Sequence, residues 1–458
     1  MLEAKTARGG IKWPGIGVIA LLAGLVVLPL YPKIALIAIR DTYIPIRIDD
    51  LVTMAILAAW AVVLVRERRR PRVPPVALPA VVWLGFGLLS LVLGAAVLGT
   101  IGWGTGILFW AKPIEYLLLG WAAYDLLDRP DRWRAAIWIV FITAAVVVGY
   151  ALLERFQLVP PAPNYASDVT ARRGALGSTM GDQHQMASYL GIVVLTGAAL
   201  WHRARRWLRV GGLVALVATA YVLQHAAARS EFIALGLGLV VLLSWRPARL
   251  PAAVMLLSMA IMFVLPFSAE RALDRAFGLP SAASTDGSPG FDGTAGGPPV
   301  SVAGRIADLG DDRSLSIRLE RWPVFINKAM QDPLFGVGPS AATEAADGYY
   351  VRSFTEVGIV GTIAFVTMIV AVVLALRRVV REGAGAPRAL AIGLIVATLF
   401  VALVSVLIDT WVASRVMQLY WPLVGAALAT RWWASRPGRG AEDPRPGPPD
   451  GTRSRGSP

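Results

Sequence analysis

The residues best suited to chemistry lie where a Gly-rich polar loop runs into an apolar segment, at 336–365, "GVGPSAATEAADGYYVRSFTEVGIVGTIAF". Asp347 precedes the apolar segment and could orient or deprotonate a hydroxyl group. Glu356 lies one or two helical turns inside, where an ionisable group is costly unless it is paired or faces a polar cavity. The structural alternatives are helix capping by Asp347 and an i, i+4 pair between Arg352 and Glu356. Tyr350 could contact a ligand or serve as an interfacial aromatic residue.

Arginines in other polar segments could bind an anion, because a guanidinium group stays charged and binds phosphate oxygens in a bidentate manner. The candidates are Arg229 in "ARSEF", Arg172 and Arg173 beside a glycine, and Arg318 and Arg321 in "SIRLER". The alternatives are a side chain that reaches the lipid headgroups for Arg229, a loop contact for Arg172 and Arg173, and a solvated helix face for the last two.

The composition indicates which class of protein positions these residues. The 458 residues are 56% hydrophobic and only 16% charged, with a mean hydropathy of +0.60. Many apolar runs reach about 18 to 22 residues, enough to cross a hydrocarbon core as helix. They do not alternate as barrel strands would, for example "AAIWIVFITAAVVVGYALL". The sequence therefore predicts an all-α polytopic membrane protein.

The polar composition argues against a metal site and a nucleic-acid partner. There is no cysteine and there are only three histidines, so we expect no metal and no cofactor. The net charge of +14 is explained by membrane topology and by contact with anionic lipids, so a nucleic-acid partner is not needed. Lys112 and Glu115 are expected inside a membrane span, where they could line a cavity or neutralise each other.

We expect about twelve transmembrane helices. The predicted spans are 14–31, 50–65, 76–98, 106–124, 135–154, 185–201, 210–225, 230–245, 250–267, 348–376, 389–408 and 414–431. Most of the 44 Lys and Arg residues fall in segments on one side, such as "RERRRPR" and "HRARRWLR". Because short cytoplasmic loops are enriched in these residues, both termini are expected in the cytoplasm of a bacterium, with the protein in the inner membrane.

The predicted organisation has four parts. Membrane helices occupy 1–267, an extracytoplasmic loop 268–347 and further membrane helices 348–433. A disordered cytoplasmic tail occupies 434–458, which is rich in Pro, Gly and Arg.

The large loop is itself composite. Residues 278–312 are rich in Gly, Pro, Ser and Asp and are expected to be flexible. Residues 314–331, "SLSIRLERWPVFINKAMQ", carry apolar residues at near-helical spacing. They predict an amphipathic helix on the membrane surface, interrupted or begun near Pro323.

The segment "SIRLERWPVFINKAMQDPLFGVGPS" and the following "DGYYVRSFTEVGIVGTIAF" resemble the signature region of the O-antigen ligase and O-antigen polymerase superfamily. In that family an Arg- and Trp-bearing surface helix leads to a "P-L-x-G-x-G" turn, then to a polar motif and a helix that opens "E-x-G-x-x-G". Two further stretches, "ARRGALGSTMGDQHQMASYL" and "AARSEFIALGLGLVVLL", resemble other family segments. The second stretch places Arg229 at the position of a family arginine.

One position departs from the family pattern. Where the ligases have His-Asn, and where that His is the expected catalytic group, this chain has Asp347 and Gly348. His184 stands where the family usually has Asn. Asp347 resembles the polysaccharide polymerase members more closely than the ligases. His184 and His225 could replace the missing His or could be polar caps.

The resemblance implies transfer of a glycan from a polyprenyl diphosphate to an acceptor hydroxyl on the extracytoplasmic face. The implied catalytic residues are Asp347, Arg229 and Glu356. The implied partners are the lipid-linked glycan, a glycan or lipid acceptor, and membrane lipids. The residues that would bind diphosphate or glycan are Arg172, Arg173, Arg318, Arg321 and Tyr350.

Two other functions are left open by the sequence. One is a polysaccharide or lipid transporter without covalent chemistry, although no matched halves are visible in the sequence. The other is a non-catalytic scaffold for polysaccharide assembly.

Overall fold

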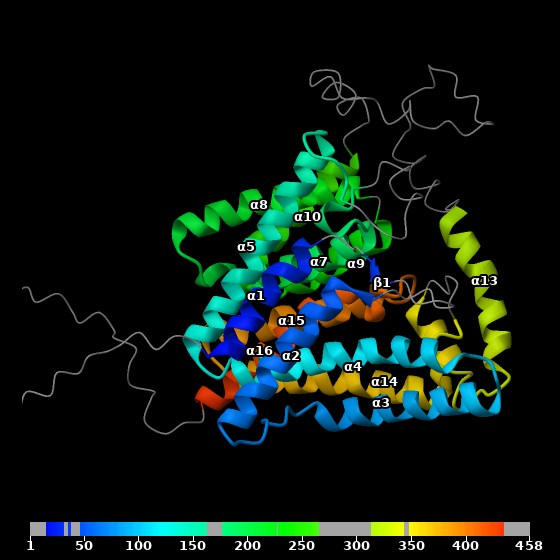
Figure 1. The fold of residues 1–458 in the computed structure, drawn as a ribbon. Helices are drawn as coiled ribbons and strands as arrows, with labels where there is room; N and C mark the ends of the chain where they lie inside the picture. The colour runs from blue at the N-terminus through cyan, green and yellow to red at the C-terminus, as the bar shows by residue number, and fades with distance from the viewer. Residues whose placement is uncertain are drawn as a thin grey trace, which may run out of the picture.

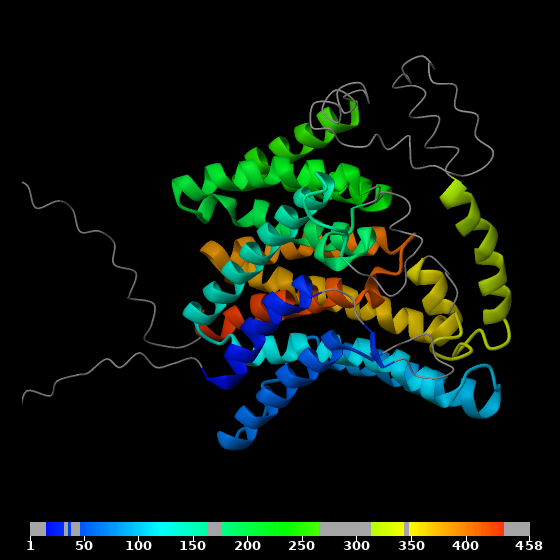
Figure 2. The same cartoon turned by 45° about the horizontal axis from the view of Figure 1, so that its top comes forward.

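The computed structural model describes residues 15–31, 35–37, 46–162, 176–226, 228–264, 313–342 and 348–434. The described chain is a helical bundle (Figures 1 and 2) with one two-stranded antiparallel ribbon, β1 (Ala35–Ile37) and β2 (Ile46–Arg47). The long helices are α1 (Ile16–Leu30), α2 (Ile48–Arg66), α3 (Ala77–Val92), α4 (Trp103–Leu126), α5 (Pro130–Arg155), α7 (Gln183–Leu200), α8 (Arg206–His225), α9 (Arg229–Leu243), α10 (Arg249–Val264), α13 (Arg313–Ala329), α14 (Tyr349–Glu382), α15 (Gly385–Val404) and α16 (Ser414–Ala434).

The structure confirms an all-α membrane architecture. Within the described ranges, six helices are long and apolar enough to cross a membrane: α2, α3 with its π-helical extension η1 (Leu93–Val97), α5, α8, α14 and α15. The other predicted spans coincide with α1, α4, α7, α9, α10 and α16. The total of twelve spans and their orientation stay predictions.

Small residues bring the helices close together. Helix α4 packs on α16, and α7 packs on α15. A Cβ on Gly120 of α4 would lie 3.0 Å from the backbone oxygen of Trp421 in α16. A Cβ on Gly393 of α15 would lie 2.7 Å from the Cα of Thr196 in α7. Lipid offers no hydrophobic drive to helix association, so such close backbone packing is an important source of bundle stability.

The helix predicted at 314–331 is present as α13, and its location at the membrane surface stays a prediction. It crosses the end of the bundle at a steep angle to α3, α4 and α14 (Figures 1 and 2) and packs on α14, with Phe325 and Ala329 buried. Val324 and Met330 are exposed on its other side. The expected interruption near Pro323 is wrong, because the helix begins ten residues earlier and runs through the proline.

Helix α14 is broken near its start. Gly358 has φ of +68° and ψ of −175°, so the chain leaves helical geometry there and resumes it immediately afterwards. A break inside an apolar helix frees backbone groups that lipid cannot satisfy, so such breaks occur where protein or a cavity supplies partners.

The partners of this break come from residues 333–338, "PLFGVG", which we call the interlock loop. Its amides at Val337 and Gly338 donate to the carbonyl oxygens of Thr355 and Glu356, at 3.0 and 3.1 Å. Its carbonyl oxygens accept from the other side of the break: Ile359 N donates to Pro333 O at 3.0 Å, and Val360 N to Leu334 O at 3.2 Å. The loop therefore replaces the helical hydrogen bonds that the break removes.

The "P-L-x-G-x-G" turn and the "E-x-G-x-x-G" helix start each contribute a glycine to this contact. Gly336 has φ of +78°, and a Cβ there would lie 2.5 Å from the Glu356 carbonyl oxygen. Gly358, also at positive φ, faces the backbone of Leu334 just as closely. On the far side of the loop, a Cβ on Gly94 of η1 would lie 2.5 Å from Val337 O, and Thr100 Oγ1 donates to that oxygen at 2.5 Å.

Gly336→Ala is expected to destabilise the protein by about 3 kcal/mol or more, because it adds left-handed strain and a backbone overlap. The measurement is the melting temperature of the detergent-purified protein, together with its level in membranes. Gly85→Ala in α3 is the matched control, since a Cβ there meets nothing within 4 Å. Equal melting temperatures for the two variants would contradict the interlock.

Candidate functional site

A buried arginine lies at the start of α14, between two acids. Arg352 is 7% exposed, and its Nε lies 3.1 Å from Glu356 Oε1. Its Nη1 lies 2.6 Å from Asp409 Oδ2, in the turn between α15 and α16. The guanidinium carbon lies 4.4 Å from the centroid of the Phe109 ring in α4. The i, i+4 pair predicted as an alternative is thus present, and it is extended by an acid that lies 57 residues away.

The turn that carries Asp409 also holds the beginning of α14. Gly348 is the N-cap residue of that helix, and its amide donates to Asp409 Oδ1 at 3.3 Å. The next amide, at Tyr349, donates to Ser405 O at 2.8 Å. A carboxylate at a helix N-terminus is favoured by the helix dipole. At the described start of α14, Gly348 therefore occupies the N-cap position and Asp409 binds its amide. Asp347, predicted as a possible cap, lies outside the described residues.

Glu356 joins this centre to the interlock loop. Its side-chain Oε1 accepts from Arg352 and from the amide of Ser340, which lies 3.1 Å away. Ser340 has φ of +77°, a strained conformation for a residue with a side chain. The backbone oxygen of Glu356 accepts from Gly338 N and from Ser90 Oγ. Glu356 is 4% exposed, so this geometry favours a positioning role over direct contact with a substrate.

A second buried ionic cluster begins where β2 meets α2. Arg47 Nη2 lies 3.0 Å from Asp49 Oδ2 and donates to Ser414 Oγ, at the start of α16, at 2.5 Å. The amide of Arg47 donates to Asp50 Oδ2 at 2.9 Å, which caps α2. Asp50 also accepts a hydrogen bond from Lys112 of α4.

Lys112 is therefore shared between two acids. Its Nζ is hydrogen-bonded to Asp50 and lies 3.6 Å from Glu115 Oε2. The expected pairing of Lys112 with Glu115 is present, but Asp50 is the nearer partner. Burial of ions is costly, so several opposite charges share this interior position.

Arg415, which follows Ser414 in α16, is bound by backbone carbonyl oxygens and not by a carboxylate. It is 2% exposed, and Nη1 donates to Thr179 O at 3.2 Å while Nη2 donates to Tyr31 O. Thr179 Oγ1 in turn donates to Pro29 O at 2.8 Å. These bonds satisfy carbonyl groups at the C-terminus of α1, where a cation is also favoured by the helix dipole. No carboxylate of the described residues lies within ion-pair distance of Arg415.

A third polar pair connects α7 and α9. His184 Nδ1 lies 2.9 Å from Glu231 Oε1, and Glu231 is only 1% exposed. Glu231 Oε2 accepts from Ser230 Oγ at 2.7 Å. The pair fixes the start of α9, at which Arg229 is an exposed residue. His225 instead contacts the carbonyl oxygen of Tyr221 at 2.8 Å through Nδ1, as a polar cap does.

These contacts place the polar groups at one end of the bundle, which we call the polar end. Arg415 links the start of α16 to the end of α1, and Arg47 links it to the start of α2. The start of α14 is bound to the end of α15. Helix α13 belongs to the same end, because Thr355 Oγ1 of α14 donates to its Phe325 O at 3.1 Å.

The predicted site residues are only partly described. Arg172, Arg173 and Asp347 lie outside the described residues, and Arg318 lies in α13 with its side chain outside them. Arg321 is exposed on α13. No described contact joins Arg321 to Arg229.

Tyr350 is half-buried and its hydroxyl donates to Ala402 O at 3.0 Å. In the part of the chain that the structure describes, no cluster of His, Asp and Glu is arranged to hold a metal ion.

Several groups of the polar end were missed by sequence reasoning. Asp409 lies in the short turn between two predicted spans, and Asp49 and Asp50 follow Arg47 in "RIDD" at the start of another span. The available signal was a charged residue at the edge of an apolar run, as at Glu356. The pairing of these residues depends on contacts between helices distant in sequence, so it could not be found from spacing.

The fold and the ionic centres define a membrane-embedded helical protein with a polar end, and the family comparison is consistent with this class. The family model described as O-antigen ligase matches residues 214–362, about a third of the chain. The matched region runs from α8 to just beyond the break in α14, and so includes Arg229, α13, the interlock loop and Glu356. This match confirms the resemblance to the O-antigen ligase and polymerase superfamily over residues 214–362. No curated protein matches the chain.

Glu356→Gln is expected to destabilise the protein by about 2 kcal/mol or more, because it leaves a buried guanidinium with less compensating charge. The measurement is the melting temperature of the purified protein. Glu382→Gln is the matched control: it removes an ion pair to Arg431 whose side chains are 55% and 37% exposed, so the expected change is within about 1 kcal/mol. Unchanged stability for Glu356→Gln, with activity lost, would assign Glu356 a catalytic role instead.

Proposed function

We propose that this protein is a membrane glycosyltransferase that transfers a polyprenyl-diphosphate-linked glycan to an acceptor hydroxyl at the polar end. The single observation that supports this most strongly is the match to the O-antigen ligase family, whose members are glycosyl-transfer enzymes. The matched region contains the surface helix, the interlock loop and the broken helix that are built into one unit here.

The reaction requires charge stabilisation on the leaving diphosphate. The acceptor oxygen forms a bond to the anomeric carbon while the bond from that carbon to the diphosphate oxygen breaks, and the diphosphate leaves with the electron pair. Cations at the leaving group lower the barrier most, because that is where negative charge develops. We assign this role to Arg229, with Arg172, Arg173, Arg318 and Arg321 as further diphosphate or glycan ligands.

The acceptor hydroxyl must be oriented and must lose its proton. We assign this to Asp347, one residue before the N-cap of α14. The ordered start of α14 supports the assignment, because the adjoining Gly348 and Tyr349 amides are bound to Asp409 and to Ser405. Arg352 and Glu356 then act as positioning residues that hold this helix start, and Tyr350 contributes to the wall beside it.

The broken helix could also suggest a transporter, since discontinuous helices form the substrate sites of many transporters. In those proteins the breaks occur in paired halves near the membrane midplane. Here the break in α14 lies nine residues after its start and 24 residues before its end. At 1.5 Å per residue it is about 13 Å from the polar end and about 36 Å from the other. The position favours a site near one surface.

Arg229→Ala is expected to lower glycan transfer by about 100-fold or more, by analogy with the loss of one charge-stabilising group at a reacting centre. Arg229→Lys is expected to retain part of the activity, because lysine keeps the charge and loses the bidentate fork. The measurement is glycan extension or attachment in a strain that lacks its own copy, at equal protein level in membranes. Arg378→Ala, at an exposed arginine of α14 far from the polar end, is the control.

Asp347→Ala is expected to abolish transfer at normal protein level, because it removes the group that orients the acceptor.

In a strain that lacks the protein, the glycan that stays bound to the carrier lipid distinguishes a polymerase from a ligase. Single repeat units on the lipid indicate a polymerase, and complete unattached chains indicate a ligase. Full activity in both Arg229→Ala and Asp347→Ala would refute the site.

A further inference from the structure

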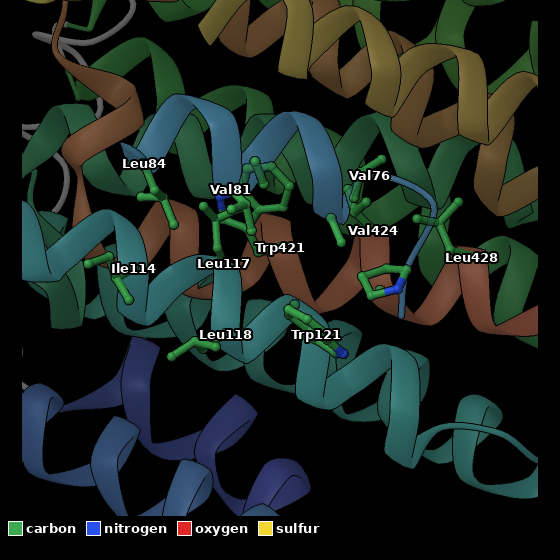
Figure 3. A pocket seen from close by; sticks show the side chains of 15 residues that line it. Val76, Val81, Leu84, Ile114, Leu117, Leu118, Trp121, Trp421, Val424 and Leu428 are labelled. Carbon is green, nitrogen blue, oxygen red and sulfur yellow. The ribbon is translucent and has the colours of Figure 1, made fainter. Parts of the chain in front are cut away.

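An apolar groove lies between α3, α4 and α16 (Figure 3). Its volume is about 150 Å³, and it is lined by apolar side chains such as Val81, Leu84 and Leu117 and by two tryptophans, Trp121 and Trp421. Along α3 it extends from Ala77 to Leu84, about 10 Å at 1.5 Å per residue. Its lining offers water no polar partners, so the groove favours an apolar guest.

The groove is open to the outside of the bundle and not part of the sealed core. Val81 on its rim is 56% exposed, whereas Ala77 and Ala80 on its floor are 9% and 7% exposed. The two alanines provide the space, because a larger side chain at either position would occupy it. The shape therefore fits a hydrocarbon chain that enters sideways from the lipid.

One end of the groove is bordered by the arginine-rich segment 66–72. This segment is at the end of α2 opposite Asp49 and Asp50, so it lies away from the polar end. It is fixed to the end of α4 by two ion pairs: Arg69 to Asp125 at 2.8 Å and Arg72 to Asp128 at 3.1 Å. Hydrogen bonding to Asp125 raises the pKa of the Arg69 guanidinium, so this anchor stays ionised.

With the segment anchored, its other arginines face outward. Arg66, Arg68 and Arg70 are exposed and take part in no ion pair within the described chain. Trp121 connects the two features, because it lines the groove and donates through Nε1 to the backbone oxygen of Arg72 at 2.7 Å. Tryptophan is the residue type that commonly lies at the level of the lipid headgroups.

We propose that the groove and the adjoining arginines form a binding site for one anionic phospholipid. One acyl chain occupies the groove between α3, α4 and α16, and the phosphate headgroup contacts Arg68 and Arg70. The positive charge of these side chains selects an anionic headgroup over a zwitterionic one, with the stabilisation that basic residues gain at an anionic membrane surface. The site is separate from the proposed reaction, which lies at the opposite end of the bundle.

The test is native mass spectrometry of the full-length protein in detergent, with phosphatidylglycerol or with phosphatidylcholine of the same acyl chains. We expect a one-to-one adduct with phosphatidylglycerol that survives at least tenfold better than the adduct with phosphatidylcholine. We also expect phosphatidylglycerol to raise the melting temperature. Equal retention of the two lipids would overturn the proposal, as would displacement of phosphatidylglycerol by a polyprenyl phosphate, which would assign the groove to the carrier lipid.

Two pairs of variants separate the groove from the headgroup site. Ala80→Phe fills the groove and is expected to remove the adduct, whereas Leu78→Phe, at a 74% exposed position of the same helix, is expected to retain it. The Arg68→Gln and Arg70→Gln double variant is expected to lose the preference for phosphatidylglycerol. Arg377→Gln with Arg378→Gln, two exposed arginines of α14, is the charge control. If Ala80→Phe does not fold, the double variant decides: an unchanged preference overturns the proposal.

Discussion

The hydrogen bonds between the interlock loop and the break in α14 are the constraint on which the rest of the structure depends. A long apolar helix that stops being helical at Gly358 exposes amides and carbonyl oxygens where no water is available. The loop at 333–338 supplies partners on both sides of the break, and only glycine at 336 and 358 allows the two backbones to approach closely enough. The surface helix, the loop and the start of α14 must therefore fold as one unit.

That unit also determines where charge can be placed. Glu356 is the last residue but one before the break, and its backbone oxygen belongs to the interlock while its side chain holds Arg352. Arg352 in turn holds Asp409, which fixes the turn between α15 and α16. Beyond that turn, Ser414 and Arg415 connect to α2, α1 and the segment before α7. The ionic groups thus form a series of contacts across the polar end and not isolated salt bridges.

Much of the helical layout could be predicted from the sequence, because a span is signalled by local hydropathy. Each expected apolar run coincides with a helix, and the spacing in "SIRLERWPVFINKAMQ" predicted α13. Pro323 misled the prediction, since a proline within an otherwise favourable amphipathic helix is tolerated here. The reason for the motif glycines was not accessible, because it lies in a contact between the loop at 333–338 and residues 355–360 of α14. Asp409 and Arg47 were missed for the same reason.

The candidate site is less completely predicted than the fold. The i, i+4 pair of Arg352 and Glu356 follows from helical spacing and is present. Ser340 and Asp409 extend this pair, and the buried Glu356 carboxylate accepts hydrogen bonds from both Arg352 and Ser340, which favours a positioning role for it. The roles of Arg229 and Asp347 still depend on the family resemblance and on their place at helix starts.

The central claim is that the polar end makes and breaks a glycosidic bond. The most direct measurement uses the purified protein in liposomes that contain a polyprenyl-diphosphate-linked glycan and an acceptor, with both products quantified. The account predicts that each glycan joined to the acceptor is accompanied by one released polyprenyl diphosphate. Movement of the lipid-linked glycan across the bilayer with no released diphosphate would contradict it and would favour a transporter.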